Sequence, residues 1–260
     1  MTRSINSGPI EWDAETYDAV SDPQFSWGIE VLERLELRGD EVVLDAGCGS
    51  GRVTEELAKR LPEGQVIAVD GSEAMIAKAR ERLGERVSYL VADLSELRVE
   101  KPVDLVFSTA TFHWIVDHDR LFQRLRSALR PGGRLVAQCG GAGNVAEHAV
   151  AIREVAARPQ FASHLAGLSA MWNFAAPDAT EGKLHAAGFE ETRCWLEPKP
   201  VTPPDPLGFT MTVTLGPHLA RLPEELRRPF AEAVLDLSEK PLTLEYVRLN
   251  IEARRPGSAA

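Results

Sequence analysis

A glycine-rich turn directly after a short apolar run is the feature that most limits how this chain can fold. The run Val42-Val43-Leu44-Asp45-Ala46 leads into Gly47-Cys48-Gly49-Ser50-Gly51, and a helix-period pattern begins at Arg52. Glycines at alternate positions remove Cβ atoms where the backbone must turn sharply and approach a ligand closely. The helix that follows offers free N–H groups and the positive end of its dipole. This arrangement predicts a nucleotide-like ligand at the edge of an α/β sheet.

The spacing of the three glycines separates this turn from other nucleotide-binding turns. The dinucleotide fingerprint requires Gly-x-Gly-x-x-Gly, but here the third glycine comes one position early and Arg52 occupies its place. The turn also lacks the Gly-Lys-Ser/Thr ending of a phosphate-binding loop. A nucleotide-sugar or NAD-dependent oxidoreductase is therefore disfavoured. A chance glycine turn between a strand and a helix is the structural alternative for this segment.

Short apolar runs alternate with helix-period segments between residues 40 and 140. The runs predict five strands, over residues 42–45, 66–69, 87–91, 103–107 and 134–139. Between them lie helical patterns, such as the one that Ser72 caps and Gly84 ends. Strands that alternate with helices predict an α/β fold with a Rossmann-like, doubly wound sheet.

The flanking segments have weaker patterns. Before the sheet, Ile29, Leu32 and Leu35 predict a helix packed on the sheet edge. After residue 140 we expect helices over 145–157, 180–187 and 224–237, and strands over 192–196 and 243–253. The last strand is expected to be antiparallel to a mostly parallel sheet, with a helical lid inserted before it. The expected organisation is a cofactor-covering helical segment over 1–40, a cofactor-binding core over 41–143, and a substrate lid with the remaining core strands over 144–260.

Composition limits the partners of the chain. Its 260 residues are enough for one large domain, and the net charge of −10 disfavours nucleic acid, which requires a basic surface. No apolar run reaches the roughly 18 residues that span a bilayer, and the first residues lack the apolar region of a secretory signal. The three cysteines are far apart and form no metal-spaced pair. We therefore expect a cytoplasmic protein with a small-molecule partner and with neither a membrane nor a metal site; the oligomeric state is left open.

Two carboxylates stand where expected strands end. Asp70 follows the second strand about 20 residues after the glycines, where an acidic side chain accepts hydrogen bonds from ribose hydroxyls. Asp93 ends the third strand, beside the expected position of the adenine ring. Its carboxylate can accept a hydrogen bond from the exocyclic amine of that ring. The alternatives are a solvated carboxylate for Asp70 and a helix cap for Asp93. Met75 is placed either against the adenine or in the core.

These motifs together resemble the class I S-adenosylmethionine-dependent methyltransferases. The resemblance rests on Asp45–Gly51, Asp70-Gly71-Ser72, Ala92-Asp93-Leu94, Ser108–Trp114 and Leu129–Leu135. Within this class, the chain most resembles the trans-aconitate methyltransferase-like group. This more specific resemblance rests on His113-Trp114, on the Leu-Arg-Pro-Gly-Gly ending, and on Tyr17, Gln24 and Trp27 in the N-terminal segment. It covers roughly residues 12–143, and Thr109 departs from the asparagine that relatives often show. The resemblance implies S-adenosylmethionine as cofactor and a binding set of Gln24, Trp27, Asp45, Gly47, Cys48, Gly49, Gly51, Asp70, Gly71, Ser72, Met75, Ala92, Asp93, Leu94 and Ser108.

The group includes small-acid carboxyl methyltransferases, so a carboxylate is the favoured acceptor. A carboxylate is already a nucleophile at neutral pH and needs no base, but the pocket should hold it with Arg, Lys, Tyr or Trp donors. A hydroxyl or amine acceptor needs a base, for which His113 is the best placed catalytic candidate. The predicted substrate residues are Tyr17, His113, Trp114 and Trp172, while the sequence does not separate Arg153, Arg193, Arg221 and Arg248. Methylation of a hydroxyl, an amine or a carbon of a secondary metabolite, and binding of the cofactor without turnover, are the alternatives.

Overall fold

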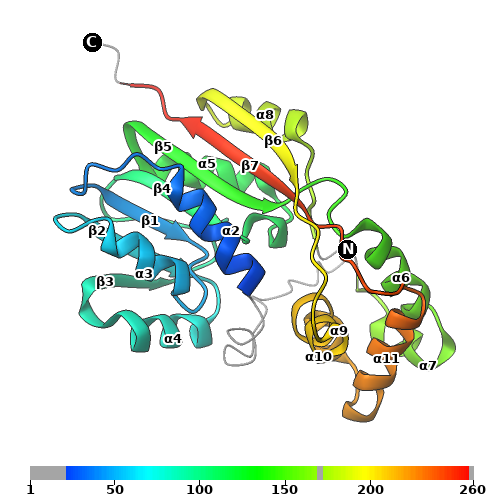
Figure 1. The fold of residues 1–260 in the computed structure, drawn as a ribbon. Helices are drawn as coiled ribbons and strands as arrows, with labels where there is room; N and C mark the ends of the chain where they lie inside the picture. Colours follow the sequence, from blue (N-terminus) through cyan, green and yellow to red (C-terminus); the bar gives the residue numbers. More distant parts are fainter. Residues whose placement is uncertain (1–21, 169–171, 258–260) are drawn as a thin grey trace, which may run out of the picture.

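The computed structural model describes residues 22–168 and 172–257, which form a seven-stranded mixed sheet with helices on both faces (Figure 1). The strands occur in the order β3-β2-β1-β4-β5-β7-β6. Strands β1 to β5 pair in parallel, whereas β7 is antiparallel to both β5 and β6. The expected Rossmann-like sheet with an antiparallel last strand is therefore confirmed. The strand bounds are β1 Val42–Ala46, β2 Gln65–Asp70, β3 Val87–Val91, β4 Val103–Thr109, β5 Leu129–Gly140, β6 Glu190–Pro198 and β7 Val247–Arg254.

The strand order reverses between β1 and β4. Strands β2 and β3 lie on one side of β1, and β4 with the later strands lies on the other. In open α/β sheets, ligands bind at the carboxyl ends of the strands beside such a reversal of strand order. The glycine turn follows β1, and a 3₁₀ turn, η2 (Phe112–Trp114), follows β4. This topology brings the two motifs that the sequence singled out to one edge of the sheet.

Each face of the sheet has its own apolar core. On one face lie α2 (Asp22–Glu33), α3 (Arg52–Lys59) and α4 (Glu73–Leu83), seen in front of the sheet in Figure 1, and η1 (Gly84–Arg86) continues α4. On the other lie α5 (His118–Ala128) and α8 (Pro177–Ala186). The Ser72 hydroxyl accepts a hydrogen bond from the Met75 N–H at 3.3 Å, so the predicted cap of α4 is confirmed. Burial of both faces accounts for the nearly continuous apolar character of the central strands.

Two local predictions were wrong. Helix α2 does not pack on the sheet edge; it contacts the central strands β4 and β5 as well as α3, and its Val31 and Leu32 are fully buried. The fifth strand, predicted over 134–139, begins earlier, because α5 ends at Ala128 and β5 starts at Leu129, so Pro131-Gly132-Gly133 lies within the strand. Leu129 pairs with Val103 before a shift in register, so pairing with β4 overrides the turn signal of the proline and glycines.

The helical part of the molecule is built from two separate segments. One lies between β5 and β6 and contains α6 (Ala146–Ala156) and α7 (Pro159–Leu165); the other lies between β6 and β7 and contains α9 (Pro206–Phe209), α10 (Gly216–Arg221) and α11 (Glu224–Asp236). A π-helical turn, η3 (Thr210–Thr214), joins α9 to α10. Their apolar side chains share one core, in which Phe161 meets Phe230 edge to face at 5.0 Å. The insertion expected before the last strand is thus one half of this unit, and Figure 1 shows the unit beside the sheet.

Replacing Gly47 should reduce stability more than replacing Gly49. Both have positive φ, +87° and +55°, but a Cβ on Gly47 would lie 2.1 Å from Thr111 Oγ1, whereas a Cβ on Gly49 would meet nothing within 4 Å. We expect Gly49→Ala to cost about 1–2 kcal/mol of backbone strain, and Gly47→Ala a further 1–3 kcal/mol of overpacking. Urea unfolding of the two variants without cofactor measures the difference. Equal losses would show that the Thr111 contact does not constrain the turn.

Candidate functional site

The glycine turn is tied to strand β2 by backbone hydrogen bonds. The N–H groups of Gly47 and Cys48 both donate to the Val69 carbonyl, at 2.7 and 3.0 Å, and the Gly51 N–H donates to the Cys48 carbonyl at 3.1 Å. Gly51 also lies against α4, where a Cβ would be 3.2 Å from Ala79. The turn is therefore held between β2 and α4, and close packing as well as φ requires glycine at positions 47 and 51.

The Asp70 carboxylate closes this turn. Its Oδ2 accepts the Gly49 N–H at 2.9 Å, and its Oδ1 accepts the Ser72 N–H at 2.9 Å. One side chain thus fixes the loop after β1 relative to the loop after β2. The predicted contact of Asp70 with ribose would use the remaining lone pairs of the same oxygens. Asp70 consequently has a structural role that the sequence did not indicate.

Asp45 is a buried acid behind the turn. Its side chain is 2% exposed, and Oδ2 accepts a hydrogen bond from Thr54 Oγ1 at 2.7 Å. Burial raises the pKa of Asp45 to about 7; the negative charge of Asp70 adds to this rise, and the Thr54 hydrogen bond opposes it. Asp45 therefore changes its protonation state near neutral pH, and a nearby cation would favour the ionised form.

The turn fits a ligand of nucleoside type with a positive charge. The space beside Gly49 is open, because no atom of the described residues lies within 4 Å of the point that a Cβ would occupy there. Helix α3 starts after Gly51, which supplies no side-chain cap to its first N–H groups. The Asp70 carboxylate, at the end of β2, closes this turn and provides negative charge, while Asp45 lies buried behind it with a raised pKa. These groups fit a cationic nucleoside such as S-adenosylmethionine.

The other predicted cofactor residues differ in how accessible they are. Asp93 is exposed, and its Oδ1 accepts from the N–H and hydroxyl of Ser95, at 2.8 and 2.7 Å. This local turn resembles the cap that the sequence allowed, and the second oxygen is left for a ligand. Ala92 and Gly71 are half-buried beside the strand ends. The side chains of Cys48, Ser72, Met75, Leu94 and Ser108 are buried.

Two of these side chains, Leu94 and Ser108, pack or hydrogen-bond inside the protein. Leu94 belongs to the core shared with α5, and the Ser108 hydroxyl donates to the Ala46 carbonyl at 2.6 Å. Burial raises the pKa of the Cys48 thiol, so it is not a thiolate nucleophile. Contacts from Leu94 and Ser108 to a cofactor would have to come from their backbone.

A second hollow, the aromatic pocket, lies where the two helical segments meet the sheet. Its walls come from α2, η2, the segments after β5 and before α8, η3, and the start of β7. They comprise Gln24, Ala110, His113, Trp114, Asn144, Val145, Trp172, Phe174, Val213, Thr214, Tyr246 and Arg248. Four of the predicted residues, Gln24, His113, Trp114 and Trp172, thus meet in one pocket. Tyr17 lies outside the described residues.

His113 is fixed in this pocket by backbone contacts. It is 8% exposed, and its Nδ1 accepts a hydrogen bond from the Gly140 N–H at 3.3 Å. Its carbonyl accepts the Asn173 N–H at 2.8 Å, which ties η2 to the segment before α8. Burial, together with the positive charge of Arg248, lowers the pKa of His113 well below its usual value. The imidazole is neutral throughout the physiological pH range.

Arg248 is the buried cation of the aromatic pocket. It is 3% exposed, and its guanidinium lies 4.8 Å from the ring centroid of Trp27. The Asn144 side chain accepts the Val247 N–H at 2.9 Å and so holds the start of β7 against the pocket. Trp27 in turn packs on Tyr246 at 5.2 Å between ring centroids. Trp27, which the resemblance assigns to the cofactor, is therefore placed behind Arg248.

Stacked rings form the opposite wall. Trp172 stacks on Phe174 with ring centroids 5.6 Å apart and planes at 14°, and Phe174 stacks on His113 at 5.8 Å. Trp114 contacts both Trp172, at 6.0 Å, and His113, at 5.1 Å. The wall consists of aromatic rings. Arg248 is the charged side chain that lines the pocket, and His113, Gln24, Asn144, Thr214 and Tyr246 are its polar side chains, so an anion there would interact by charge with Arg248.

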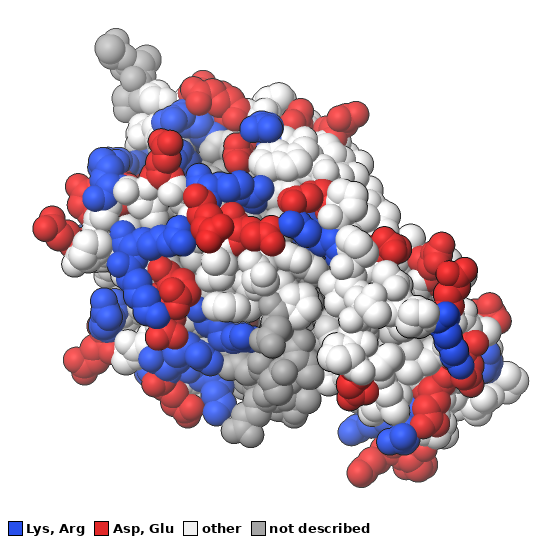
Figure 2. Space-filling model, in the orientation of Figure 1, with Lys and Arg blue, Asp and Glu red and all other residues white. Residues whose placement is uncertain are grey.

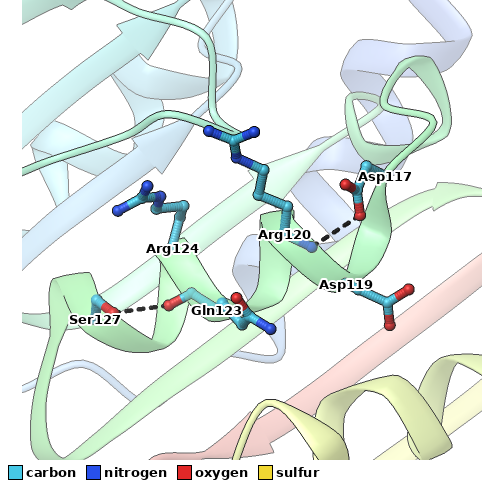
Figure 3. A pocket seen from close by; sticks show the side chains of 6 residues that line it. All are labelled: Asp117, Asp119, Arg120, Gln123, Arg124 and Ser127. Carbon is cyan, nitrogen blue, oxygen red and sulfur yellow. Dashed lines mark hydrogen bonds between the residues drawn. The ribbon is translucent and has the colours of Figure 1, made fainter.

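A hollow on the outer side of α5 is not a credible site. Figure 3 shows its side chains spread along the exposed surface of the helix: Asp117, Asp119, Arg120, Gln123, Arg124 and Ser127. The charges are matched by neighbours, because Arg120 and Arg124 pair with Glu96 and Lys183 pairs with Asp119. Exposed pairs of this kind are worth little and leave no charge for a ligand.

The face drawn in Figure 2 carries charges of both signs. On the face in Figure 2, basic and acidic side chains are interspersed over the sheet part of the molecule, without one continuous basic stripe. Within residues 22–168 and 172–257, no group of three or more His, Cys, Asp or Glu is placed to hold a metal ion. Of the helices that the structure describes, none has the length and hydropathy to cross a membrane.

Several pocket residues escaped the sequence analysis. Phe174 carried a weak signal, because it is two residues from Trp172 in an aromatic stretch. Asn144 and Thr214 had none, since each depends on the packing of distant segments. Arg248 was one of four arginines that the sequence did not separate. Of the other three, Arg193 is exposed and stacks over Trp195 at 4.5 Å, outside the pocket.

A family model and two sequence relatives that match this chain are all methyltransferases. A family model for a methyltransferase domain matches residues 43–133. The trans-aconitate 2-methyltransferase of Methylobacterium nodulans is 34% identical over 186 residues, which cover 72% of this chain and 67% of that protein. The enzyme of that name from Acidovorax ebreus is 36% identical over 128 residues, 49% of this chain and 49% of that protein. The matched segment thus spans about half the length of the second relative.

Solved structures share the fold. Phosphoethanolamine N-methyltransferase 2 of Haemonchus contortus, in complex with phosphomonomethylethanolamine and S-adenosylhomocysteine, matches with a TM-score of 0.61 at 21% identity, covering 94% of this chain and 57% of that chain. The cyclase SpnF matches with a TM-score of 0.56 at 21% identity, covering 90% and 82%. Because a methyltransferase and a cyclase share this fold, the fold alone does not decide the reaction.

The raised pKa of Asp45 should make stability depend on pH. The folded protein prefers the protonated acid, so this contribution to the free energy of unfolding is full below about pH 4 and is lost as the pH rises to about 7. Asp45→Asn keeps an acceptor for Thr54 but does not titrate. We expect the difference between the native and variant unfolding free energies to fall across this window in urea titrations. A constant difference would contradict the burial argument.

Asp70→Ala should weaken binding of S-adenosylhomocysteine roughly 10- to 150-fold, from the loss of about 1.5–3 kcal/mol of charge-assisted hydrogen bonding. The variant loses the ribose acceptor as well as the two amide contacts that shape the turn. Calorimetric titration measures the dissociation constant, and circular dichroism confirms the fold. Asp236→Ala, an exposed acid on α11, serves as the control. An unchanged constant for a folded Asp70 variant would exclude this role.

Proposed function

This chain belongs to the class I S-adenosylmethionine-dependent methyltransferases, and we propose that it transfers a methyl group to a carboxylate of a small organic acid. The observation that carries this choice of acceptor is Arg248, an arginine buried in the aromatic pocket. A buried guanidinium favours a carboxylate, which it can bind through two parallel hydrogen bonds. The relatives named trans-aconitate 2-methyltransferase point to the same class of acceptor.

The glycine turn and the aromatic pocket both border the segment that follows β4. The Thr111 hydroxyl lies 3.2 Å from the Gly47 carbonyl and 2.9 Å from the Thr109 carbonyl, while its neighbours Ala110 and His113 line the aromatic pocket. The segment after β4 thus has the turn on one side and the pocket on the other. A cofactor on the turn and an acceptor in the pocket would face each other across this segment.

The chemistry requires little from the side chains beyond positioning. When bound, S-adenosylmethionine supplies a methyl group that its sulfonium already activates. A carboxylic acid has a pKa of about 4 and is therefore already ionised at neutral pH, so it can attack without a base. Arg248 would hold the anion, the aromatic wall would exclude water, and the 110–113 segment would set the line of approach. Alignment of this kind can supply about 7–11 kcal/mol in favourable reactions.

Trans-aconitate is the first acceptor to test. We expect the native protein to transfer a labelled methyl group from S-adenosylmethionine to trans-aconitate or a related di- or tricarboxylate, and not to the corresponding amides. Arg248→Met should raise the acceptor KM roughly 10- to 150-fold, because one charge-assisted interaction is lost.

Arg193→Met is the matched control, because Arg193 also stacks on a tryptophan but lies outside the pocket. It should retain the native KM. Transfer to amines or alcohols with no transfer to any acid, or an Arg248 variant with native KM for the acid, would refute the proposed acceptor class.

A further inference from the structure

We propose that His113 is a fixed hydrogen-bond donor to the acceptor carboxylate beside Arg248, and not the general base of the reaction. The inference rests on the proposed function for the identity of the acceptor. The protonation state and tautomer of the His113 imidazole are inferred from the geometry of the aromatic pocket alone. The two parts are separable, because the position of the imidazole proton can be measured without any acceptor.

The backbone selects the tautomer of His113. The Gly140 N–H donates to Nδ1, and a nitrogen that accepts a hydrogen bond cannot carry a proton. Nε2 of the neutral ring is therefore the protonated nitrogen. Since Gly140 is the last residue of β5, this donor is fixed in the sheet and does not reorient. The tautomer is set by the strand and not by the side chain's own preference.

The surroundings also oppose uptake of a second proton. Among the described residues, the charges of Arg248 and His118 act on the His113 imidazole, and both disfavour the imidazolium, while the Cys139 thiol interacts with the His113 backbone. His118 is buried, with Nε2 2.9 Å from the Phe112 carbonyl. On the remaining sides the ring meets Trp114 and Phe174, which carry no charge. A base must accept a proton at Nε2, yet here Nε2 already holds one and its neighbours repel another.

A neutral donor next to a cation is suited to an anion. Arg248 supplies charge and His113 supplies a directed N–H, so together they can bind a carboxylate at two points. The same pair disfavours a protonated amine, which the guanidinium would repel, and it provides no base for a hydroxyl. The pocket thus restricts the acceptor to groups that are nucleophilic anions before they bind.

Two substitutions at His113 distinguish a donor from a base. His113→Gln places an amide N–H near the position of Nε2 but has no basic nitrogen, and His113→Ala has neither. If His113 donates, the alanine variant should raise the KM for trans-aconitate roughly 10- to 150-fold, and glutamine should restore most of it. If His113 is a base, both variants should lose about 10²–10⁴-fold in kcat, which would overturn the proposal.

His164→Gln, at an exposed histidine of α7, is the control for the substitution itself and should retain native constants. The pH profile gives a second readout. With a donor, the profiles of kcat/KM for the native and glutamine proteins should have the same shape. Loss of an ionisation in the glutamine variant alone would overturn the donor role.

The proton can be located directly by nitrogen NMR of the histidine-labelled protein in its complex with S-adenosylhomocysteine. We expect the His113 signals of a neutral ring protonated at Nε2, assigned by their absence from His113→Gln. A proton on Nδ1, or a ring that titrates near pH 6.5, would overturn the proposal.

A wrong acceptor class and a wrong donor role for His113 would give different experimental results. If the native protein methylates no acid, the acceptor class is wrong, and the proposal that a donor pair binds a carboxylate falls with it. If it methylates acids but His113→Gln behaves like His113→Ala with a loss in kcat, the function stands and the donor role does not. Calorimetric titration of trans-aconitate into the S-adenosylhomocysteine complex separates binding from turnover in each variant.

Discussion

The contact between Gly47 and Thr111 is the constraint on which the site depends. It joins the ends of β1 and β4 at the point where the strand order reverses. A Cβ at residue 47 would overlap Thr111, so only glycine permits the two loops to approach this closely. The cofactor turn lies on one side of this contact and the aromatic pocket on the other. A wider separation would leave the two without a common boundary.

Charge is divided across that boundary. The Asp70 carboxylate places negative charge at the glycine turn, and Arg248 places positive charge in the pocket. Under the proposed function this division suits a cationic donor on one side and an anionic acceptor on the other. It also explains why the imidazole of His113 is kept neutral, since a second buried cation next to Arg248 would be costly. Electrostatics and tautomer therefore point to the same use of the pocket.

The backbone positions the pocket residues from three directions. Strand β5 reaches His113 through Gly140, the segment before α8 reaches it through Asn173, and Asn144 holds the start of β7 that carries Arg248. Each of these contacts joins residues more than 25 positions apart in the chain, as for Gly140 and His113, which are 27 apart. The site is consequently a product of the assembled sheet rather than of one loop.

The sequence by itself determined the parts of this protein that depend on local pattern. Apolar runs and helix periods predicted the five parallel strands and the helices between them, because burial on both faces leaves a nearly continuous apolar signal. The glycine spacing and the strand-end carboxylates indicated the cofactor class, since backbone conformation and distance along the chain are readable without contacts. His113, Trp114 and Trp172 were found as pocket candidates through motif and residue type.

Only the tertiary structure decided which residues share a site and in what chemical state. It selected Arg248 from four arginines, added Phe174 and Asn144, moved α2 from the sheet edge to its centre, and assembled the helical unit from two segments. It also showed that Asp70 binds the Gly49 N–H of the turn and that the Gly140 N–H selects the tautomer of His113. The physical reason is that burial, charge environment and hydrogen-bond partners depend on strand order and register across the chain, which no local pattern encodes.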